Sequence, residues 1–157
     1  MILSRLKHAR AITEMFLKAP AYFVTVTFNW KGEVSERSAS SRLSDFSHRI
    51  DEQLLGGRFY RKPPQERLLF VFVPELKDAY YHYHGLMAAP PIVQRRAELA
   101  QFESLVETTW KNIVPSSTTD CQNLNDEGAM MYATKENNLN GDDAVWSLDF
   151  WSSLSQK

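Results

Sequence analysis

The chain has 157 residues, of which 43% are hydrophobic and 24% are charged, and its formal net charge is −1. This length and composition predict one globular domain and exclude a disordered or collagen-like chain. The longest strictly apolar run, Leu68–Val73, is far shorter than the ~20 residues that span a bilayer. Charges interrupt the N-terminal MILSRLKHAR, where a signal peptide needs its apolar core. We therefore expect a cytoplasmic location and no membrane partner.

The single cysteine and the lack of a phosphate-loop motif exclude several kinds of site. Cys121 has no second cysteine to pair with, which excludes an internal disulfide and a cysteine-based zinc site and fits a reducing compartment. The pattern GxxxxGKS/T does not occur, which excludes a P-loop ATPase. Because the net charge is close to zero, a nucleic-acid partner would need a local basic patch.

The first half of the chain predicts a helix, a strand and a second helix. Residues 2–18 carry apolar residues at helical spacing, and Pro20 ends this helix. Residues 21–30, AYFVTVTFNW, are rich in β-branched and aromatic residues and predict a strand. The apolar stripe from Ala39 to Leu54 predicts the second helix, which ends at the Gly56-Gly57 pair.

Two strands in the middle of the chain are predicted to form a hairpin. Residues 67–75, RLLFVFVPE, are apolar on both faces and predict a central strand. Residues 80–89, YYHYHGLMAA, predict the next strand, and the four-residue turn Leu76–Ala79 makes the two antiparallel. After Pro90-Pro91, the apolar stripe from Leu99 to Ile113 predicts another helix.

The last third of the chain is predicted to add a short strand at 120–124, DCQNL, and a helix from Glu127 to about Asn137. The tail, 138–157, is expected to pack back onto the domain through its aromatic residues. The whole order predicts an α+β fold, in which a central antiparallel sheet is flanked by helices, mostly on one face. We assign residues 1–157 to one domain with a core of about 20–137.

The strongest chemical feature is the pair His82 and His84. Residues two apart in a strand point to the same side, so both imidazoles can chelate one divalent ion. With the four-residue turn, Glu75 pairs with Tyr80 and lies diagonal to His82 on the histidine face. A turn one residue longer or shorter would move this carboxylate to the other face. The set suits Mg²⁺ or Mn²⁺; the alternative is two half-buried histidines and an exposed glutamate.

A second feature is Tyr132 with Lys135 in MMYATKE, three residues apart and therefore on one face of the predicted helix. A tyrosine is a poor nucleophile at neutral pH because its pKa is ~10. A metal ion that polarises the electrophile, together with a nearby lysine, relieves this difficulty. The alternative is a packed tyrosine beside a solvated lysine.

In this order, FVTVTFN, HYHGLM and YATK resemble the three motifs of the HUH endonucleases, most closely those of rolling-circle replication initiators. The resemblance spans about residues 23–136 and implies a ferredoxin- or RRM-like sheet. It implies that His82 and His84 are the metal-binding pair and that Glu75 is a third ligand. It also implies that Tyr132 is the nucleophile, accompanied by Lys135. Position 128 is Gly and position 136 is Glu, so the chain resembles the single-tyrosine members.

The resemblance implies metal-dependent nicking and rejoining of single-stranded DNA through a 5′-phosphotyrosine, with a free 3′-hydroxyl that starts rolling-circle replication. The expected partners are single-stranded DNA or an origin hairpin. Because the chain has neither the room nor the phosphate loop for the helicase domain that viral initiators often add, we expect a nuclease-only protein or a fragment. A separate helicase is a candidate partner. The alternatives within the superfamily are a single-strand transposase and a relaxase.

Two sets of residues are candidates for DNA contact. The first set lies on one face of the first strand and could line a DNA groove beside the metal. The second set surrounds Phe59 and Tyr60 in a basic segment. In such a segment, cations can contact the phosphates of a single strand and aromatic rings can stack on its bases. These residues are Thr25, Thr27 and Asn29 in the strand, and Arg58, Arg61, Lys62 and Arg67 in the basic segment. The alternatives are ordinary polar strand residues and a solvated loop.

The alternative from another class is a non-catalytic, RRM-like nucleic-acid-binding module. Such a module would stack bases on exposed strand aromatics, for which Phe23, Tyr81 and Tyr83 are the candidates. It has no use for a carboxylate that converges with two histidines. Stabilisation by a divalent ion separates the two hypotheses, because a ligand of the native state raises its stability.

Overall fold

The computed structural model describes Phe16 and residues 20–29, 34–77, 80–93, 96–124 and 143–151. The helices predicted at 2–18 and 127–137 lie outside these residues, apart from Phe16. In the part of the chain that is described, no helix is both long and apolar enough to cross a membrane.

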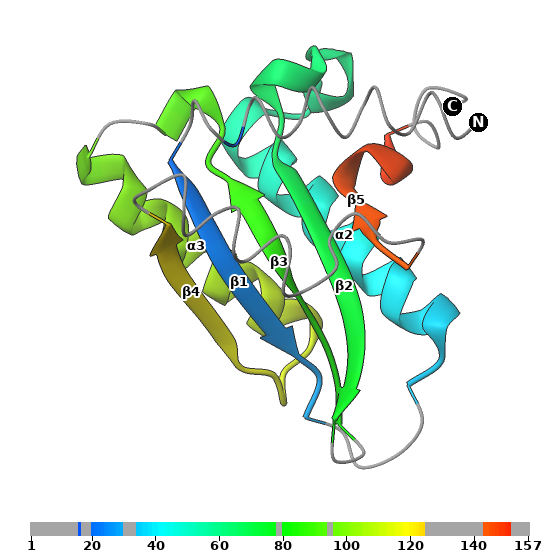
Figure 1. Cartoon of the computed structure of the whole chain (residues 1–157). Coiled ribbons are helices and arrows are strands. Elements are labelled where there is room, and N and C mark those ends of the chain that lie inside the picture. Colours follow the sequence, from blue (N-terminus) through cyan, green and yellow to red (C-terminus); the bar gives the residue numbers. More distant parts are fainter. Residues whose placement is uncertain are drawn as a thin grey trace.

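Five antiparallel strands form one sheet in the order β4-β1-β3-β2-β5, with two long helices in the connections (Figure 1). The arrangement β-α-β-β-α-β, with β1 and β3 in the centre, is the split βαβ or ferredoxin-like topology. The α+β fold class predicted from the sequence is confirmed. The strands are β1 (Ala21–Thr27), β2 (Leu69–Lys77), β3 (Tyr80–Ala88), β4 (Thr119–Leu124) and β5 (Val145–Trp146). The helices are α2 (Glu36–Leu55) and α3 (Arg96–Ile113).

Helix α2 begins and ends where its sequence provides caps. The Ser35 hydroxyl oxygen accepts the backbone N–H of Ser38 at 3.1 Å, which satisfies one of the free donors of the first turn. The helix ends at Gly56, whose φ of 88° lies in the left-handed region that glycine adopts without cost. Its predicted apolar stripe, from Ala39 to Leu54, packs against the sheet, with Ala39 to Ile50 buried and Leu54 partly buried.

Both long helices cover the same face of the sheet, behind it in Figure 1. Alternate residues of β1, such as Val24 and Val26, point to this face and are fully buried in the main core with Trp110 of α3. The intervening residues Phe23, Thr25 and Thr27 point to the opposite face, as predicted. The predicted placement of the helices on one side is therefore confirmed for α2 and α3.

The hairpin between β2 and β3 is tighter than predicted. Leu76 and Lys77 belong to β2, and Lys77 pairs with Tyr80, so that the predicted four-residue turn at 76–79 is wrong. The register consequently differs by two residues from the predicted pairing of Glu75 with Tyr80. The first strand also ends at Thr27 rather than at residue 30.

The described part of the C-terminal tail, residues 143–151, packs onto the domain. It contributes an unpredicted strand, β5, which pairs with Val71 and Phe72 of β2. The backbone N–H of Phe70 donates to the Ser147 hydroxyl oxygen at 3.2 Å, and Phe150 is buried in the main core. The segment thus fixes the N-terminal half of β2.

Candidate metal centre

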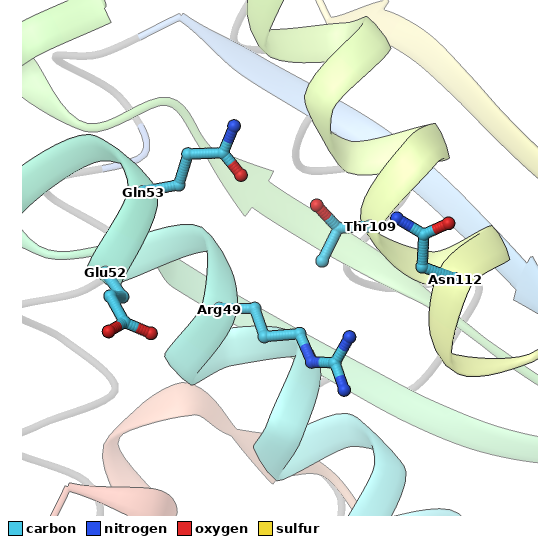
Figure 2. Close-up of a pocket in the computed structure, with 5 residues that line it drawn as sticks. All are labelled: Arg49, Glu52, Gln53, Thr109 and Asn112. Atoms are coloured by element: carbon cyan, nitrogen blue, oxygen red, sulfur yellow. The ribbon is translucent and has the colours of Figure 1, made fainter.

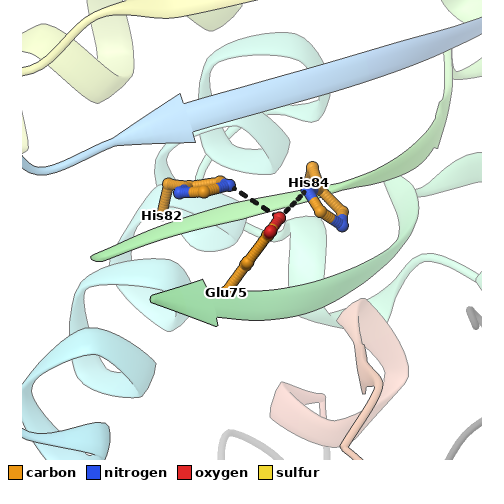
Figure 3. Close-up of side chains that lie close together, drawn as sticks. All are labelled: Glu75, His82 and His84. Carbon is orange, nitrogen blue, oxygen red and sulfur yellow. Dashed lines mark hydrogen bonds and ion pairs between the residues drawn. The ribbon is translucent and has the colours of Figure 1, made fainter. Parts of the chain in front are cut away.

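Glu75, His82 and His84 come together on the sheet face opposite the two long helices (Figure 3). Glu75 is the direct register partner of His82, and Val73 is the partner of His84. Directly paired residues share a face, and residues two apart on one strand share it as well. The predicted convergence of these three residues is confirmed.

The distances suit a shared metal ion. Glu75 Oε2 lies 3.1 Å from His82 Nε2 and 3.2 Å from His84 Nδ1, and the three ligand atoms lie within 4.8 Å of one another. Adjacent ligands of an octahedral ion with metal–ligand bonds of 2.0–2.1 Å are separated by about 3 Å. The two distances from the carboxylate oxygen to the imidazole nitrogens are therefore close to the separation of adjacent ligands on one divalent ion, and three ligands leave coordination positions open.

The environment of the three side chains favours ligation. Each imidazole is 15% exposed and the Glu75 side chain is 45% exposed, so the site is open to solvent on one side. Burial lowers the pKa of His84 below its usual value, against the opposing effect of the Glu75 charge. A neutral imidazole has a free lone pair, so this shift keeps His84 in the protonation state that binds metal.

Gly85 allows the two metal-site strands to approach each other. It faces Phe72 across the hairpin, and a Cβ atom on Gly85 would collide with the carbonyl oxygen of Val71. Only glycine fits such a close backbone approach. The glycine of HYHGL therefore sets the distance between β2 and β3, and with it the distance from Glu75 to both histidines.

Of the predicted DNA-contact residues in β1, Thr25 and Thr27 flank the metal centre. Thr25 is the register partner of His84, and Thr27 is the partner of His82. Thr27 Oγ1 accepts the backbone N–H of Thr118 at 2.8 Å, so this hydroxyl group is anchored to the loop before β4. Both threonines lie beside the centre on the same face, where the sequence places them.

Asn29 is held in a less common conformation just beyond β1. Its φ of 54° is left-handed, a region that asparagine tolerates better than most residues. Its side-chain Nδ2 donates to the Ser116 carbonyl oxygen at 3.2 Å, and the Ser116 hydroxyl donates to the Phe28 carbonyl oxygen. The loop before β4 therefore fixes the end of β1, a role that the strand pattern of the sequence does not signal.

The prediction that Arg67 contacts DNA is wrong. Its side chain is only 3% exposed, and its Nε donates to Asp51 Oδ2 at 3.0 Å. Its guanidinium carbon lies 4.5 Å from the centroid of the Trp151 ring and 5.5 Å from that of Phe59. Arg67 joins α2 to the C-terminal segment and has no surface to offer to a phosphate.

The other basic residues predicted to contact DNA are exposed but distant from the metal centre. Arg58, Arg61 and Lys62 precede the first residue of β2, whereas Glu75 lies near its last. The six residue steps of β2 from Leu69 to Glu75 span roughly 20 Å, at about 3.3 Å per residue. The structure does not bring the basic segment to the metal centre.

The strand aromatics expected of a base-stacking module are divided between the two faces. Tyr81 and Tyr83 point to the helix-covered face, and Tyr83 is 1% exposed. Their proposed role as an exposed platform is therefore wrong. Phe23 lies on the metal face, half-buried, with its ring centroid 5.9 Å from that of His84.

Two hollows lie away from the metal face. One, of about 480 Å³, is lined by residues of α2, the hairpin and the C-terminal segment, Pro74, Tyr81 and Tyr83 among them. The other, of about 320 Å³, lies between α2 and α3, where Arg49 and Thr109 line it (Figure 2). Arg49 is already paired with Asp45 at 3.0 Å, so this polar groove holds no free cation at that residue.

Tyr132 and Lys135 lie outside the described residues. The described ends of the connection that carries them are at opposite edges of the sheet, because Leu124 ends β4 and Asp143 precedes β5.

Comparisons with protein-family models, with curated proteins and with solved structures found no match to the chain.

Proposed function

We propose that this protein is a metal-dependent, single-tyrosine endonuclease that nicks and rejoins single-stranded DNA to initiate rolling-circle replication. The observation that carries the proposal is the convergence of Glu75, His82 and His84 on an open sheet face, in a chain that resembles the HUH endonucleases. A divalent ion, Mg²⁺ or Mn²⁺, held by these residues would withdraw charge from a non-bridging phosphate oxygen in the transition state.

The chain's own residues perform the transfer. The phenol oxygen of Tyr132 forms a new bond to phosphorus while the bond from phosphorus to the 3′ oxygen breaks. The phenol loses its proton and the departing 3′ oxygen gains one, so no net proton is consumed. Lys135 positions the phosphate or stabilises the phenolate. The products are a 5′-phosphotyrosine and a free 3′-hydroxyl, and attack by a 3′-hydroxyl on this ester rejoins the strands without ATP.

Two alternatives to a replication initiator stay open, one within the HUH superfamily and one outside it. A single-strand transposase or relaxase would use the same centre on a different DNA. A non-catalytic RRM-like module is less well supported, because Tyr83 is buried on the helix-covered face. As an initiator, the protein would act in a host cytoplasm on single-stranded DNA or an origin hairpin.

A covalent-adduct assay tests the proposal. The protein is incubated with a labelled pool of random-sequence, hairpin-containing single-stranded DNA, with Mn²⁺ or with EDTA, and run on denaturing gels. We expect a DNA-linked band with Mn²⁺ only, absent from Tyr132→Phe and from His82→Ala/His84→Ala, and present in Arg49→Ala as the control. Proteolysis of the adduct identifies the tyrosine that carries the DNA. If no pool gives a band with Mn²⁺, the catalytic claim is wrong.

A further inference from the structure

Tyr80 presents an aromatic ring beside the metal centre. It is the first residue of β3, and because residues two apart on a strand point to one side, it shares the face of His82 and His84. Its side chain is 38% exposed. Large hydrophobic side chains that are exposed in the described residues are Tyr60, Tyr80 and Ile92. Of these, Tyr80 alone belongs to a strand that supplies metal ligands.

The described part of β1 ends before it reaches Tyr80. The pairing of β1 with β3 ends at Thr27 and His82, and the backbone N–H of Phe28 then donates to the Tyr81 carbonyl oxygen at 3.3 Å. Asn29 is the next residue along the chain, and its left-handed φ turns the backbone away from the strand direction. The described part of β1 therefore does not extend the sheet past Tyr80, and solvent reaches the ring.

The spacing along β3 matches one nucleotide. Tyr80 and His82 are two positions apart, which is roughly 6.6 Å at about 3.3 Å per residue. This is about the length that one nucleotide of an extended single strand covers. A strand with one phosphate at Glu75, His82 and His84 would therefore place a neighbouring base over Tyr80.

We propose that Tyr80 is the stacking platform for the nucleobase next to the phosphate at the metal centre, a role that rests on the proposed function. A base stacked on an aromatic side chain contributes about 1–3 kcal/mol, and the contact tolerates any base because each has a π-face. The ring accepts an unpaired base, whereas bases within a duplex are already stacked on their neighbours. Tyr80 thus selects single-stranded over duplex DNA at the metal centre.

Tyr60, the other exposed tyrosine among the described residues, is less suited to this role. It lies in the basic segment at the opposite end of β2, and the guanidinium carbon of Arg61 already lies 5.8 Å from its ring centroid. A base bound there would sit far from the metal-site phosphate. Stacking on Tyr80 and stacking on Tyr60 therefore predict different effects of the two alanine substitutions, and one experiment can separate them.

The test is a double-mutant cycle between protein and DNA. Binding of a labelled dT20 oligonucleotide and of a matched 20-mer with abasic sites is measured by fluorescence anisotropy with Mn²⁺, with every protein carrying Tyr132→Phe so that no adduct forms. Wild type, Tyr80→Ala, Tyr80→Trp, Tyr60→Ala and the control Ile92→Ala are compared. Uptake of Mn²⁺ by each variant shows that the hairpin is intact.

We expect Tyr80→Ala to bind dT20 roughly tenfold more weakly, the factor that ~1.4 kcal/mol of lost stacking gives. Tyr80→Trp should bind as wild type does, because it keeps an aromatic face. The abasic 20-mer should bind wild type and Tyr80→Ala equally, because no base is left to stack. If Tyr80→Ala weakens both oligonucleotides equally, or if only Tyr60→Ala weakens dT20, the platform is not Tyr80. These outcomes do not depend on the adduct assay, so either proposal can fail alone.

Discussion

Glu75 lies directly opposite His82 in the β2–β3 hairpin, with Glu75 Oε2 3.1 Å from His82 Nε2. Direct cross-strand partners are the closest pairs that a sheet offers, with Cβ atoms about 4.5–5.5 Å apart. The Glu75 carboxylate therefore reaches both imidazoles while its backbone stays paired within the sheet. Rigid strands, rather than a loop, hold all three candidate ligands, which is the arrangement that preorganises a metal site.

Glu75→Gln tests the contribution of the carboxylate charge. The substitution keeps the size and the register of the side chain but removes the negative charge that a divalent ion prefers in its ligand set. We expect Mn²⁺ affinity to fall by roughly tenfold or more, because cation affinity follows the charge of the ligands. Calorimetric titration measures this change, with Glu66→Gln, an exposed carboxylate elsewhere on the chain, as the matched control. Equal affinity of the two variants would remove Glu75 from the ligand set.

Gly85→Ala tests the close approach of β2 and β3. The added Cβ atom would collide with the Val71 carbonyl oxygen, so the strands must separate. We expect the free energy of unfolding to fall by about 3 kcal/mol, the upper part of the range for overpacking. Gly57→Ala is the matched control, because a Cβ atom there meets nothing within 4 Å. Urea unfolding of both variants measures the change. If both variants lose a similar unfolding free energy, the close approach of β2 and β3 does not require glycine at position 85.

Arg67→Ala tests the structural role of the buried ion pair. Without Arg67, the fully buried Asp51 loses its charged partner, so we expect a loss of about 3–5 kcal/mol of unfolding free energy. Arg49→Ala removes an exposed ion pair with Asp45 and should cost about 0.3–0.5 kcal/mol. Chemical denaturation compares the two. A small effect of Arg67→Ala, together with weaker DNA binding, would restore Arg67 to the DNA interface.

His48 should make stability depend on pH. Burial beside Phe59 and the nearby Arg67 charge lower its pKa, against the effects of Asp51, Asp45 and a hydrogen bond to the Phe150 backbone. The unfolded chain then takes up a proton near pH 6.5 while the folded chain does not, so stability falls as the pH drops below about 6.5. His48→Gln should reduce this slope. Urea unfolding at several pH values measures it, and an unchanged slope would assign the dependence to other groups.

The sequence predicts correctly that Glu75, His82 and His84 share one face of the sheet, although the predicted turn is wrong. The predicted turn places Glu75 opposite Tyr80, whereas Glu75 pairs with His82. The two registers differ by two residues, and because side chains alternate with a period of two, the carboxylate stays on the histidine face. Alternation within one strand is local and can be predicted from the sequence, which places His82 and His84 on one side. The side on which Glu75 lies also depends on the turn length, and it is predicted correctly because the error in that length is an even number of residues.

Long-range packing accounts for the parts that the sequence does not reveal. Arg67 stands in a basic, polar stretch, and only the fold brings it to Asp51 and Trp151. Tyr83 alternates with the histidines, yet its burial depends on α2 and α3 lying behind the sheet. The two-residue strand β5 is too short for any pattern and forms because the free edge of β2 accepts it.

Uptake of Mn²⁺ measured by electron paramagnetic resonance tests the metal centre most directly, because bound Mn²⁺ loses the sharp signal of the free ion. Wild-type protein should take up one equivalent, which EDTA removes, and its melting temperature should rise with Mn²⁺. The His82→Ala/His84→Ala variant should leave the free-ion signal unchanged. If this variant takes up Mn²⁺ as wild type does, or if wild type takes up none, then Glu75, His82 and His84 do not form a metal centre.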